Sequence, residues 1–243
     1  MKNTFKLSSL LFSALLVATA MTLHAQTAAK PAEASTVMSP EAKAKSDADI
    51  EKKATDWTTA LNLNDKEKET RISAAIATHL KAVRDWNNDH SYTMVPEGIN
   101  PTTGKKLSTL ERQVIINSSI PKSVHTDLMA ALTKDLNEDQ VGIILDKYTE
   151  GKVAFTLNGY KAIVPDLTPT EEAAILVNLK LAREQAIDFK GSKQISAIFE
   201  IYKTRNEQYL NSNGRNWHKL YGDYTKAIIA KKAADAAAKQ AKQ

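Results

Sequence analysis

Apolar residues recur at intervals of three and four positions along most of the chain. The clearest stripe runs through Ile72, Ile76, Leu80 and Val83 to His90, and keeps one helix face largely apolar for about five turns. Similar stripes follow between positions 107 and 209. The chain has only 8 Gly and 7 Pro, so few of these stripes are interrupted. The pattern predicts a mostly α fold, a multi-helix bundle.

One segment, residues 153–164, departs from the helical pattern. Val153 and Phe155 stand at alternate positions, and the alternation resumes after Asn158-Gly159 as far as Val164. Asn-Gly is a strong signal for a two-residue hairpin turn. We therefore favour one short β-hairpin or extended segment here. The alternative is a short helix that is capped by Asn158 and runs through Val164.

A five-residue signal occurs four times: Leu, a residue with a short polar side chain, two further residues, then Glu or Gln. The short polar side chain can accept a hydrogen bond from a free backbone N–H at a helix start, and the Glu or Gln can reach back to the cap. Each cap contributes about 1 kcal/mol. The copies lie 44, 29 and 31 residues apart, so they form no strict repeat. They predict helix starts at Asn64, Ser108, Asn137 and Thr168.

The ends of the chain differ from its middle. Residues 1–25 have the pattern of a secretory signal peptide, in which Lys2 and Lys6 precede an apolar run and Ala25 stands at the cleavage position. Residues 26–46 predict a flexible linker, and the Ala/Lys-rich residues 226–243 a C-terminal tail in a fraying helix. We expect a periplasmic or secreted protein with a single helical domain at 47–225. No second apolar run has spanning length, so we expect no stable membrane insertion after signal cleavage.

Charge and cysteine content narrow the function further. Outside the two ends, residues 26–225 carry 26 basic and 27 acidic residues, so the positive excess of the whole chain lies at its ends. A nucleic-acid-binding domain would concentrate positive charge on a folded face, and we expect no nucleic-acid partner. The chain has no cysteine, which excludes disulfides, thiolate metal sites and a cysteine nucleophile.

No motif with a catalytic mechanism occurs in the chain, neither a nucleophile elbow nor a zinc-protease or phosphate-loop signature. His79 and His90 share a helix face but stand three turns apart, about 16 Å, so they cannot bind one metal ion. His79 lies on an apolar stripe, where a buried structural role is the usual one. We therefore expect no metal, no cofactor and no enzymatic activity.

From Trp57 to Tyr224 the chain resembles a secreted helical domain family of unknown function, whose members are described as sugar-binding and are often encoded beside polysaccharide-degrading enzymes. The resemblance implies a secreted single domain and no particular reaction. Leu157 stands where the family more usually has Tyr. The residues that carry the resemblance are Thr156-x-Asn158-Gly159-Tyr160, Pro165-x-Leu167-Thr168, Ala182-Arg183-Glu184-x-Ala186 and Tyr202-Lys203-x-Arg205-Asn206.

A second resemblance is limited to Leu167-Thr168-x-x-Glu171, which is similar to the Leu-Thr-x-x-Gln signal of small periplasmic chaperones. The sequence thus leaves three functions open. The first is a non-enzymatic carbohydrate-binding protein associated with polysaccharide use. The second is a periplasmic chaperone or assembly factor, and the third an accessory polysaccharide-active enzyme. The sequence specifies no oligomeric state.

A sugar site needs a flat aromatic ring against the apolar face of the sugar, together with planar polar groups for its hydroxyls. Four candidates follow one another at intervals of three and four residues and can share a helix face: Tyr202, Arg205, Asn206 and Tyr209. The alternative is that Tyr202 and Tyr209 pack in the core with their hydroxyls at its edge. The candidate ligand-binding residues are Asn158, Tyr160, Tyr202, Lys203, Arg205, Asn206, Tyr209 and Trp217.

Overall fold

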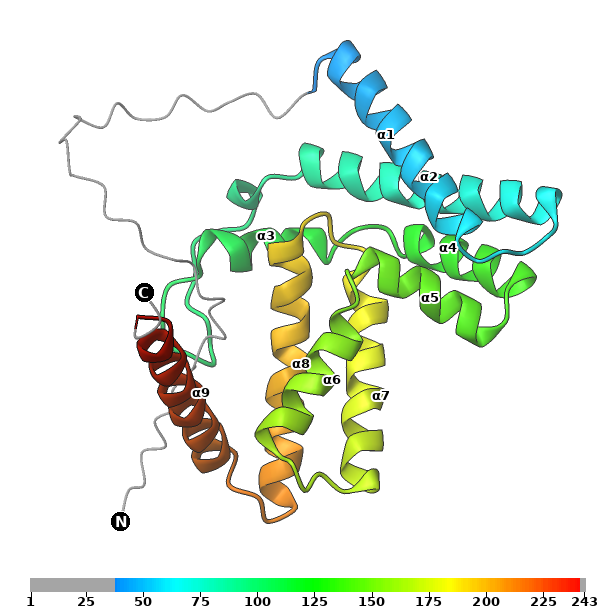
Figure 1. Cartoon of the computed structure of the whole chain (residues 1–243). Helices are drawn as coiled ribbons and strands as arrows, with labels where there is room; N and C mark the ends of the chain where they lie inside the picture. The colour runs from blue at the N-terminus through cyan, green and yellow to red at the C-terminus, as the bar shows by residue number, and fades with distance from the viewer. Residues whose placement is uncertain (1–37, 241–243) are drawn as a thin grey trace.

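The computed structural model describes residues 38–240. Within this range the chain forms nine α-helices and one short 3-10 helix, and its only β pairing is an isolated bridge between Ile99 and Lys106. The prediction of a mostly α, multi-helix fold is confirmed. In chain order the elements are α1 (Pro40–Thr59), α2 (Lys66–Asp89), η1 (Tyr92–Met94), α3 (Thr109–Asn117), α4 (Lys122–Asp135), α5 (Glu138–Tyr148), α6 (Lys152–Ile163), α7 (Pro169–Ala186), α8 (Ser192–Ser212) and α9 (Trp217–Gln240) (Figure 1).

The helices form two packed groups (Figure 1). In the first group α1 and α2 lie against α4 and α5, and in the second α6 and α8 lie against α7. α3 packs against α8. α9 lies at the edge of the second group, in contact with α6 and α8. Each group has a hydrophobic core of its own.

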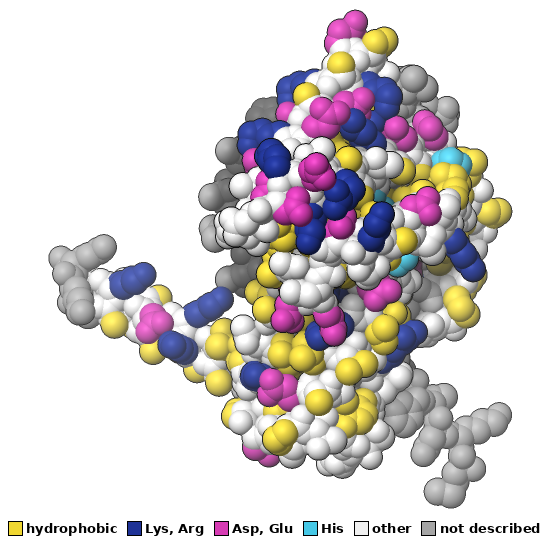
Figure 2. Space-filling view, turned by 90° about the vertical axis from the view of Figure 1, so that its right-hand side faces the viewer, with side chains coloured by type: hydrophobic (Ala, Val, Ile, Leu, Met, Phe, Trp, Pro, Cys, Tyr) yellow, Lys and Arg dark blue, Asp and Glu magenta, His cyan; other side chains and the backbone are white. Residues whose placement is uncertain are grey.

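The surface carries charges of both signs. On the face drawn in Figure 2, Lys and Arg side chains are interspersed with Asp and Glu side chains. Several of them pair, for example Lys43 with Asp85 at 3.0 Å and Arg71 with Asp135 at 2.9 Å. Exposed pairs of this kind contribute about 0–1 kcal/mol each, so most of the stability must come from apolar burial.

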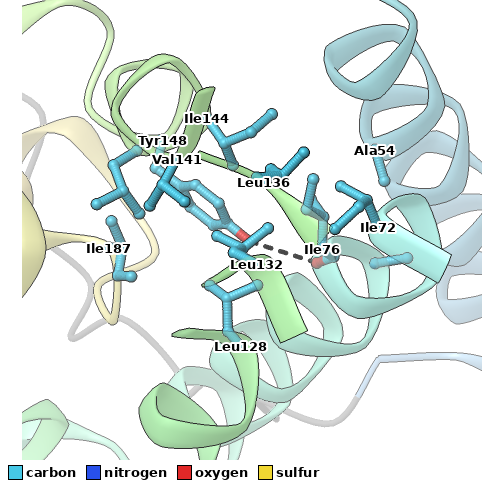
Figure 3. Packing of buried hydrophobic residues seen from close by; sticks show 12 residues of the cluster. Ala54, Ile72, Ile76, Leu128, Leu132, Leu136, Val141, Ile144, Tyr148 and Ile187 are labelled. Atoms are coloured by element: carbon cyan, nitrogen blue, oxygen red, sulfur yellow. Dashed lines mark hydrogen bonds between the residues drawn. The ribbon is translucent and has the colours of Figure 1, made fainter. Parts of the chain in front are cut away.

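The first core is built on the stripe that the sequence shows in α2. Ile72 and Ile76 are fully buried against Leu132 of α4 and Ile144 of α5. Tyr148 reaches between these helices, and its hydroxyl donates to the carbonyl of Ile76 at 3.5 Å (Figure 3). Burying one large aliphatic side chain contributes about 1.5–3 kcal/mol, so this cluster fixes how α2 sits on α4 and α5.

The second core holds the elements that frame the candidate site. Ile175 and Leu179 of α7 pack with Ile198 and Leu210 of α8, and all four are almost completely buried. The ring of Trp217, the first residue of α9, packs against this cluster while staying half-buried. The start of α9 is therefore anchored on the second group.

The connection between α7 and α8 joins the two cores. Ile187 belongs to the first core and Phe189 to the second. Between them, the carboxylate of Asp188 accepts hydrogen bonds from Nε2 of His79 at 3.0 Å and from Nδ1 of His125 at 2.9 Å. Burial alone would raise the pKa of Asp188, but the hydrogen bonds from both imidazoles outweigh it and lower the pKa. The bond to Asp188 in turn raises the pKa of His125.

The hairpin prediction for residues 153–164 is wrong, because this segment is the helix α6. The helix begins at Lys152, so the alternative of an Asn158 cap also misplaces its start. Val153, Tyr160 and Ile163 are buried, and the first two join the second core. Positions i, i+7 and i+10 share one face of a helix but not of a strand, so tertiary burial overrides the local turn preference of Asn158 and the following glycine.

Three of the four predicted helix starts are confirmed. Ser108, Asn137 and Thr168 cap α3, α5 and α7, each in a capping box closed by the Glu or Gln three residues later. The fourth prediction is one residue early, because α2 is capped by Asp65. Asn64 instead adopts a left-handed backbone with φ of 55°, which Asn tolerates better than most residues, and this turn leads the chain into α2.

The predicted linker is helical from Pro40 onward, and the predicted tail is helical as far as Gln240. Ser39 caps α1, whose helix begins at Pro40, so positions 40–46 belong to a helix and not to a flexible linker. Capping by Ser39 and proline at the first helical position explain this early start. α9 continues the chain as a helix to Gln240. The predicted signal peptide lies outside the described residues, and no helix among those described is long and apolar enough to cross a membrane.

Candidate functional site

A groove of about 300 Å³ opens where α6, α8 and α9 meet, and we call it the α6–α9 groove. Aromatic side chains form much of its lining. Tyr160 of α6 is buried, Trp217 and Tyr224 of α9 are half-buried, and Phe155 of α6 is 74% exposed. The ring centroids of Tyr160 and Trp217 lie 5.2 Å apart with planes inclined by 41°. The groove thus combines a buried ring, a half-buried wall and an exposed rim.

Tyr160 is fixed between α6 and α8. Its hydroxyl donates to the backbone carbonyl of Lys203 at 3.2 Å. Burial, followed by the negative charge of Glu207, raises its pKa well above the ordinary value. The phenol therefore stays neutral and cannot serve as a base near neutral pH. Its ring is only 2% exposed, so it forms the buried floor of the groove and supports the more exposed rings of α9.

Polar groups complete the lining. Asn158 is exposed, Thr156 is half-buried, and both line the groove from α6. Lys203 of α8 also lines it, and its ammonium donates to Oε1 of Glu200 at 2.7 Å. Gly159 lies between these groups, and a Cβ there would meet no atom within 4 Å. The glycine side of the groove is therefore open space.

The chain between α8 and α9 determines where Trp217 stands. Gly214 has φ of 85°, a left-handed value that favours glycine and turns the chain after α8. The backbone N–H of Trp217 donates to Oδ1 of Asn211 at 2.9 Å. Between these residues, Nε of Arg215 donates to Glu171 Oε1 at 2.7 Å. The position of the aromatic wall therefore depends on contacts to α7 and α8.

Four of the eight predicted ligand-binding residues meet in the groove: Asn158, Tyr160, Lys203 and Trp217. Asn206 lies outside the lining, because it is fully buried and its Oδ1 accepts from Asn178 of α7 at 2.7 Å.

The remaining three predicted residues do not line the groove. The hydroxyl of Tyr202 donates to Gln185 of α7 at 3.0 Å, and the guanidinium of Arg205 stacks 4.5 Å from the Tyr202 ring. Tyr209 is half-buried outside the lining. Tyr202 and Lys203 are neighbours in sequence, so they point about 100° apart around α8, and only one can face the groove. The face that the sequence grouped together is turned mainly toward α7.

Three further side chains line the groove that were not predicted from the sequence: Phe155, Thr156 and Tyr224. The first two were hidden by the hairpin interpretation of their segment. Tyr224 could have been predicted from the sequence. It follows Trp217 by seven residues, and two turns of α9 place both rings on one face.

A second, larger groove of about 440 Å³ lies between α1 and α2. Its lining combines Thr and Ser hydroxyls with two Glu and two Lys side chains and contains no aromatic side chain. It is crossed by an ion pair between Lys81 and Glu51 at 2.7 Å. Within residues 38–240 no group of three His, Asp or Glu side chains could hold a metal ion. His79 is buried, as its place on an apolar stripe indicated.

The family described as "Protein of unknown function (DUF3826)" matches residues 47–230 of the chain. This match covers all nine helices except the start of α1 and the end of α9. No curated protein matches the chain. The chain belongs to the DUF3826 family.

Proposed function

We propose that this DUF3826 protein is an exported, non-enzymatic protein that binds a saccharide in the α6–α9 groove. The observation that carries the proposal is the aromatic lining of the groove. Trp217 and Tyr224 face it from α9 and Tyr160 from α6. Flat rings pack on the apolar face of a sugar ring, and a few polar groups at the edge of such a site fix orientation.

The polar groups at the edge suit hydroxyl recognition. The amide of Asn158 both donates and accepts hydrogen bonds, as does the hydroxyl of Thr156, and the ammonium of Lys203 donates. The volume of about 300 Å³ lies at the small end of ligand sites, which suits one or two sugar rings. The groove is therefore matched to the end of a chain or to a short oligosaccharide.

The lining also supports binding over catalysis. Hydrolysis of a glycosidic bond ordinarily uses two carboxyl groups on either side of the bond. The residues that line the α6–α9 groove include no carboxylate and no histidine, and Lys203 is their one charged member. Chemistry of that kind would need groups from outside the lining, which supports a binding role.

A chaperone would need a contiguous apolar surface for its clients. The exposed large apolar side chains include Ile115 of α3, Ile143 of α5 and Ile229 of α9, and the pair Val177 and Leu181 on one face of α7. Single exposed apolar residues are normal on soluble proteins. The aromatic lining of the groove is the more specific feature, so we favour the saccharide proposal over a chaperone.

Export is tested by the N-terminus of the mature protein. Expressed in a bacterium with a periplasm and recovered from that compartment or the medium, the protein should begin at Gln26. A product that retains Met1 and stays in the cytoplasm would overturn this part of the proposal.

The binding test fills the groove without disturbing the cores. Gly159→Leu places a side chain in the open space of the groove, while Gly222→Leu is the matched control, since Gly222 is also helical and open but lies outside the lining. Both changes replace Gly by a better helix former, so both variants should fold. In a screen of soluble oligosaccharides followed by calorimetry, Gly159→Leu and Trp217→Ala should lose binding and Gly222→Leu should keep it. Equal binding by all three variants, or no binding by the wild type, would reject the proposal.

A further inference from the structure

α9 supplies the aromatic wall of the groove, yet it is only lightly attached to the rest of the molecule. None of its residues from Trp217 to Gln240 is fully buried. It contacts α6 and α8, and in Figure 1 it lies at the edge of the second group. Apolar burial alone therefore does not fix its direction, and some other contact must hold the wall in place.

Arg215 provides such a contact. Its guanidinium donates to both carboxylate oxygens of Glu171, from Nε at 2.7 Å and from Nη2 at 2.8 Å. It also donates to Asp166, from Nη1 to Oδ1 and from Nη2 to the backbone carbonyl, both at 2.9 Å. We call these three residues the Arg215 clamp. The clamp ties the turn before α9 to the first turn of α7 and to the connection between α6 and α7.

The clamp is well built for fixing a position. The side chain of Arg215 is 15% exposed and that of Glu171 is 7% exposed, so water competes little for the two bonds between them, whereas the side chain of Asp166 is 80% exposed. Glu171 is also held by Thr168, whose backbone N–H and hydroxyl both donate to Oε2 at 2.9 Å. A planar guanidinium that binds a carboxylate through two parallel bonds fixes direction as well as distance. Arg215 thus fixes the chain two residues before Trp217.

We infer that Arg215 is the positioning residue of the α6–α9 groove, and that its clamp preorganises the Trp217 wall for a ligand. The inference rests on the proposed saccharide function for its effect on affinity, but not for its effect on α9. With the clamp intact, the ligand meets a wall that is already in place and loses no affinity to ordering it. Without the clamp, α9 samples other directions and the groove loses its shape.

The first test needs no ligand. In a Trp57→Phe, Trp86→Phe background, Trp217 is the remaining tryptophan of the chain. Arg215→Ala should shift its fluorescence emission to the red and speed amide hydrogen exchange more in residues 218–228 than in the second half of α7. Arg205→Ala is the control, because Arg205 is an exposed arginine of α8 outside the lining. Unchanged emission and exchange in Arg215→Ala would overturn the inference.

The second test measures affinity for an oligosaccharide that the wild type binds. Arg215→Ala should weaken binding by about tenfold, the effect of losing one aromatic contact. Arg215→Lys keeps the charge but cannot make both bonds to Glu171, so it should fall between Ala and the wild type. If Arg215→Ala fails to fold, Arg215→Lys tests the effect of the clamp on affinity in its place. A loosened α9 with unchanged affinity would overturn the inference. If the wild type binds no saccharide, the proposed function fails, while emission and exchange still decide what the clamp does to α9.

Discussion

Replacing Asp188 by Asn tests the hydrogen-bonded cluster of Asp188, His79 and His125 between the two cores. The carboxylate of Asp188 accepts one hydrogen bond from each of two imidazoles, on α2 and on α4, at 3.0 and 2.9 Å. Asn retains one carbonyl oxygen, so the variant can keep one of these bonds and loses the other together with the negative charge. A hydrogen bond to a charged group contributes about 1.5–3 kcal/mol, and the partial exposure of this cluster favours the lower end of that range. We expect Asp188→Asn to lower the free energy of unfolding by about 2 kcal/mol near pH 6.

The size of this loss should depend on pH in a defined direction. The pKa of His125 is raised in the folded protein, so its contribution is complete below its unfolded value of 6.5 and is lost as pH rises through the folded value. The pKa of Asp188 is lowered, so its contribution is present above its unfolded value of 3.8 and is lost as pH falls through the folded value. Other charges face the cluster, with Glu184 3.7 Å from His125 and Lys190 near in sequence on the same connection. The loss should therefore be largest between pH 4 and 6.5.

Urea unfolding of the wild type and the variant at pH 5, 6, 7 and 8 measures this dependence. Asp127→Asn is the matched control on the exposed side of α4, and it should change stability by no more than about 0.5 kcal/mol. NMR titration should also show the pKa of His125 falling in Asp188→Asn. A loss in the free energy of unfolding that is the same at every pH, or no larger than that of the control, would refute the role of Asp188 in linking the two cores.

Further predictions concern the second core and its caps. Thr168→Ala removes the side-chain bond to the backbone N–H of Glu171 at 3.2 Å and should cost about 1 kcal/mol in thermal or urea unfolding. Glu171→Gln keeps that capping box but loses the ion pair that lowers the pKa of Glu171 to about 2, so its cost should be complete above pH 4.5 and shrink as pH falls toward 2. Leu179→Ala opens a cavity at a fully buried position and should cost about 2–5 kcal/mol, measured by the same unfolding.

The sequence predicts helix starts well because capping is local. Ser108, Asn137 and Thr168 each act on backbone groups within one turn, so five residues contain the whole signal. The Asn158-Gly159 turn signal is equally local, yet it fails because the burial of Tyr160 in the second core contributes more than a turn preference.

Only half of the predicted ligand-binding residues lie in the groove, for a related reason. Helix periodicity shows that Lys203 and Arg205 share α8, but it does not show which face α6 and α9 cover and which α7 covers. That assignment depends on contacts between residues far apart in sequence, such as Arg215 with Glu171. Tyr160 and Lys203 belong to the segments that carry the resemblance to a known family, so both could be predicted. Tyr224 lies on α9, for which the sequence predicted no ligand-binding residue other than Trp217.

The most direct test of saccharide binding in the α6–α9 groove uses the three tryptophan indoles as reporters. Trp57 packs in the first core and Trp86 donates to the carbonyl of Ile116, so both lie outside the groove that Trp217 lines. In ¹H–¹⁵N NMR spectra of the wild type titrated with oligosaccharides, the indole N–H signal of Trp217 should shift with added ligand while the other two stay in place. Shifts of Trp57 or Trp86 alone, or no shift of Trp217 with any oligosaccharide, would contradict the account.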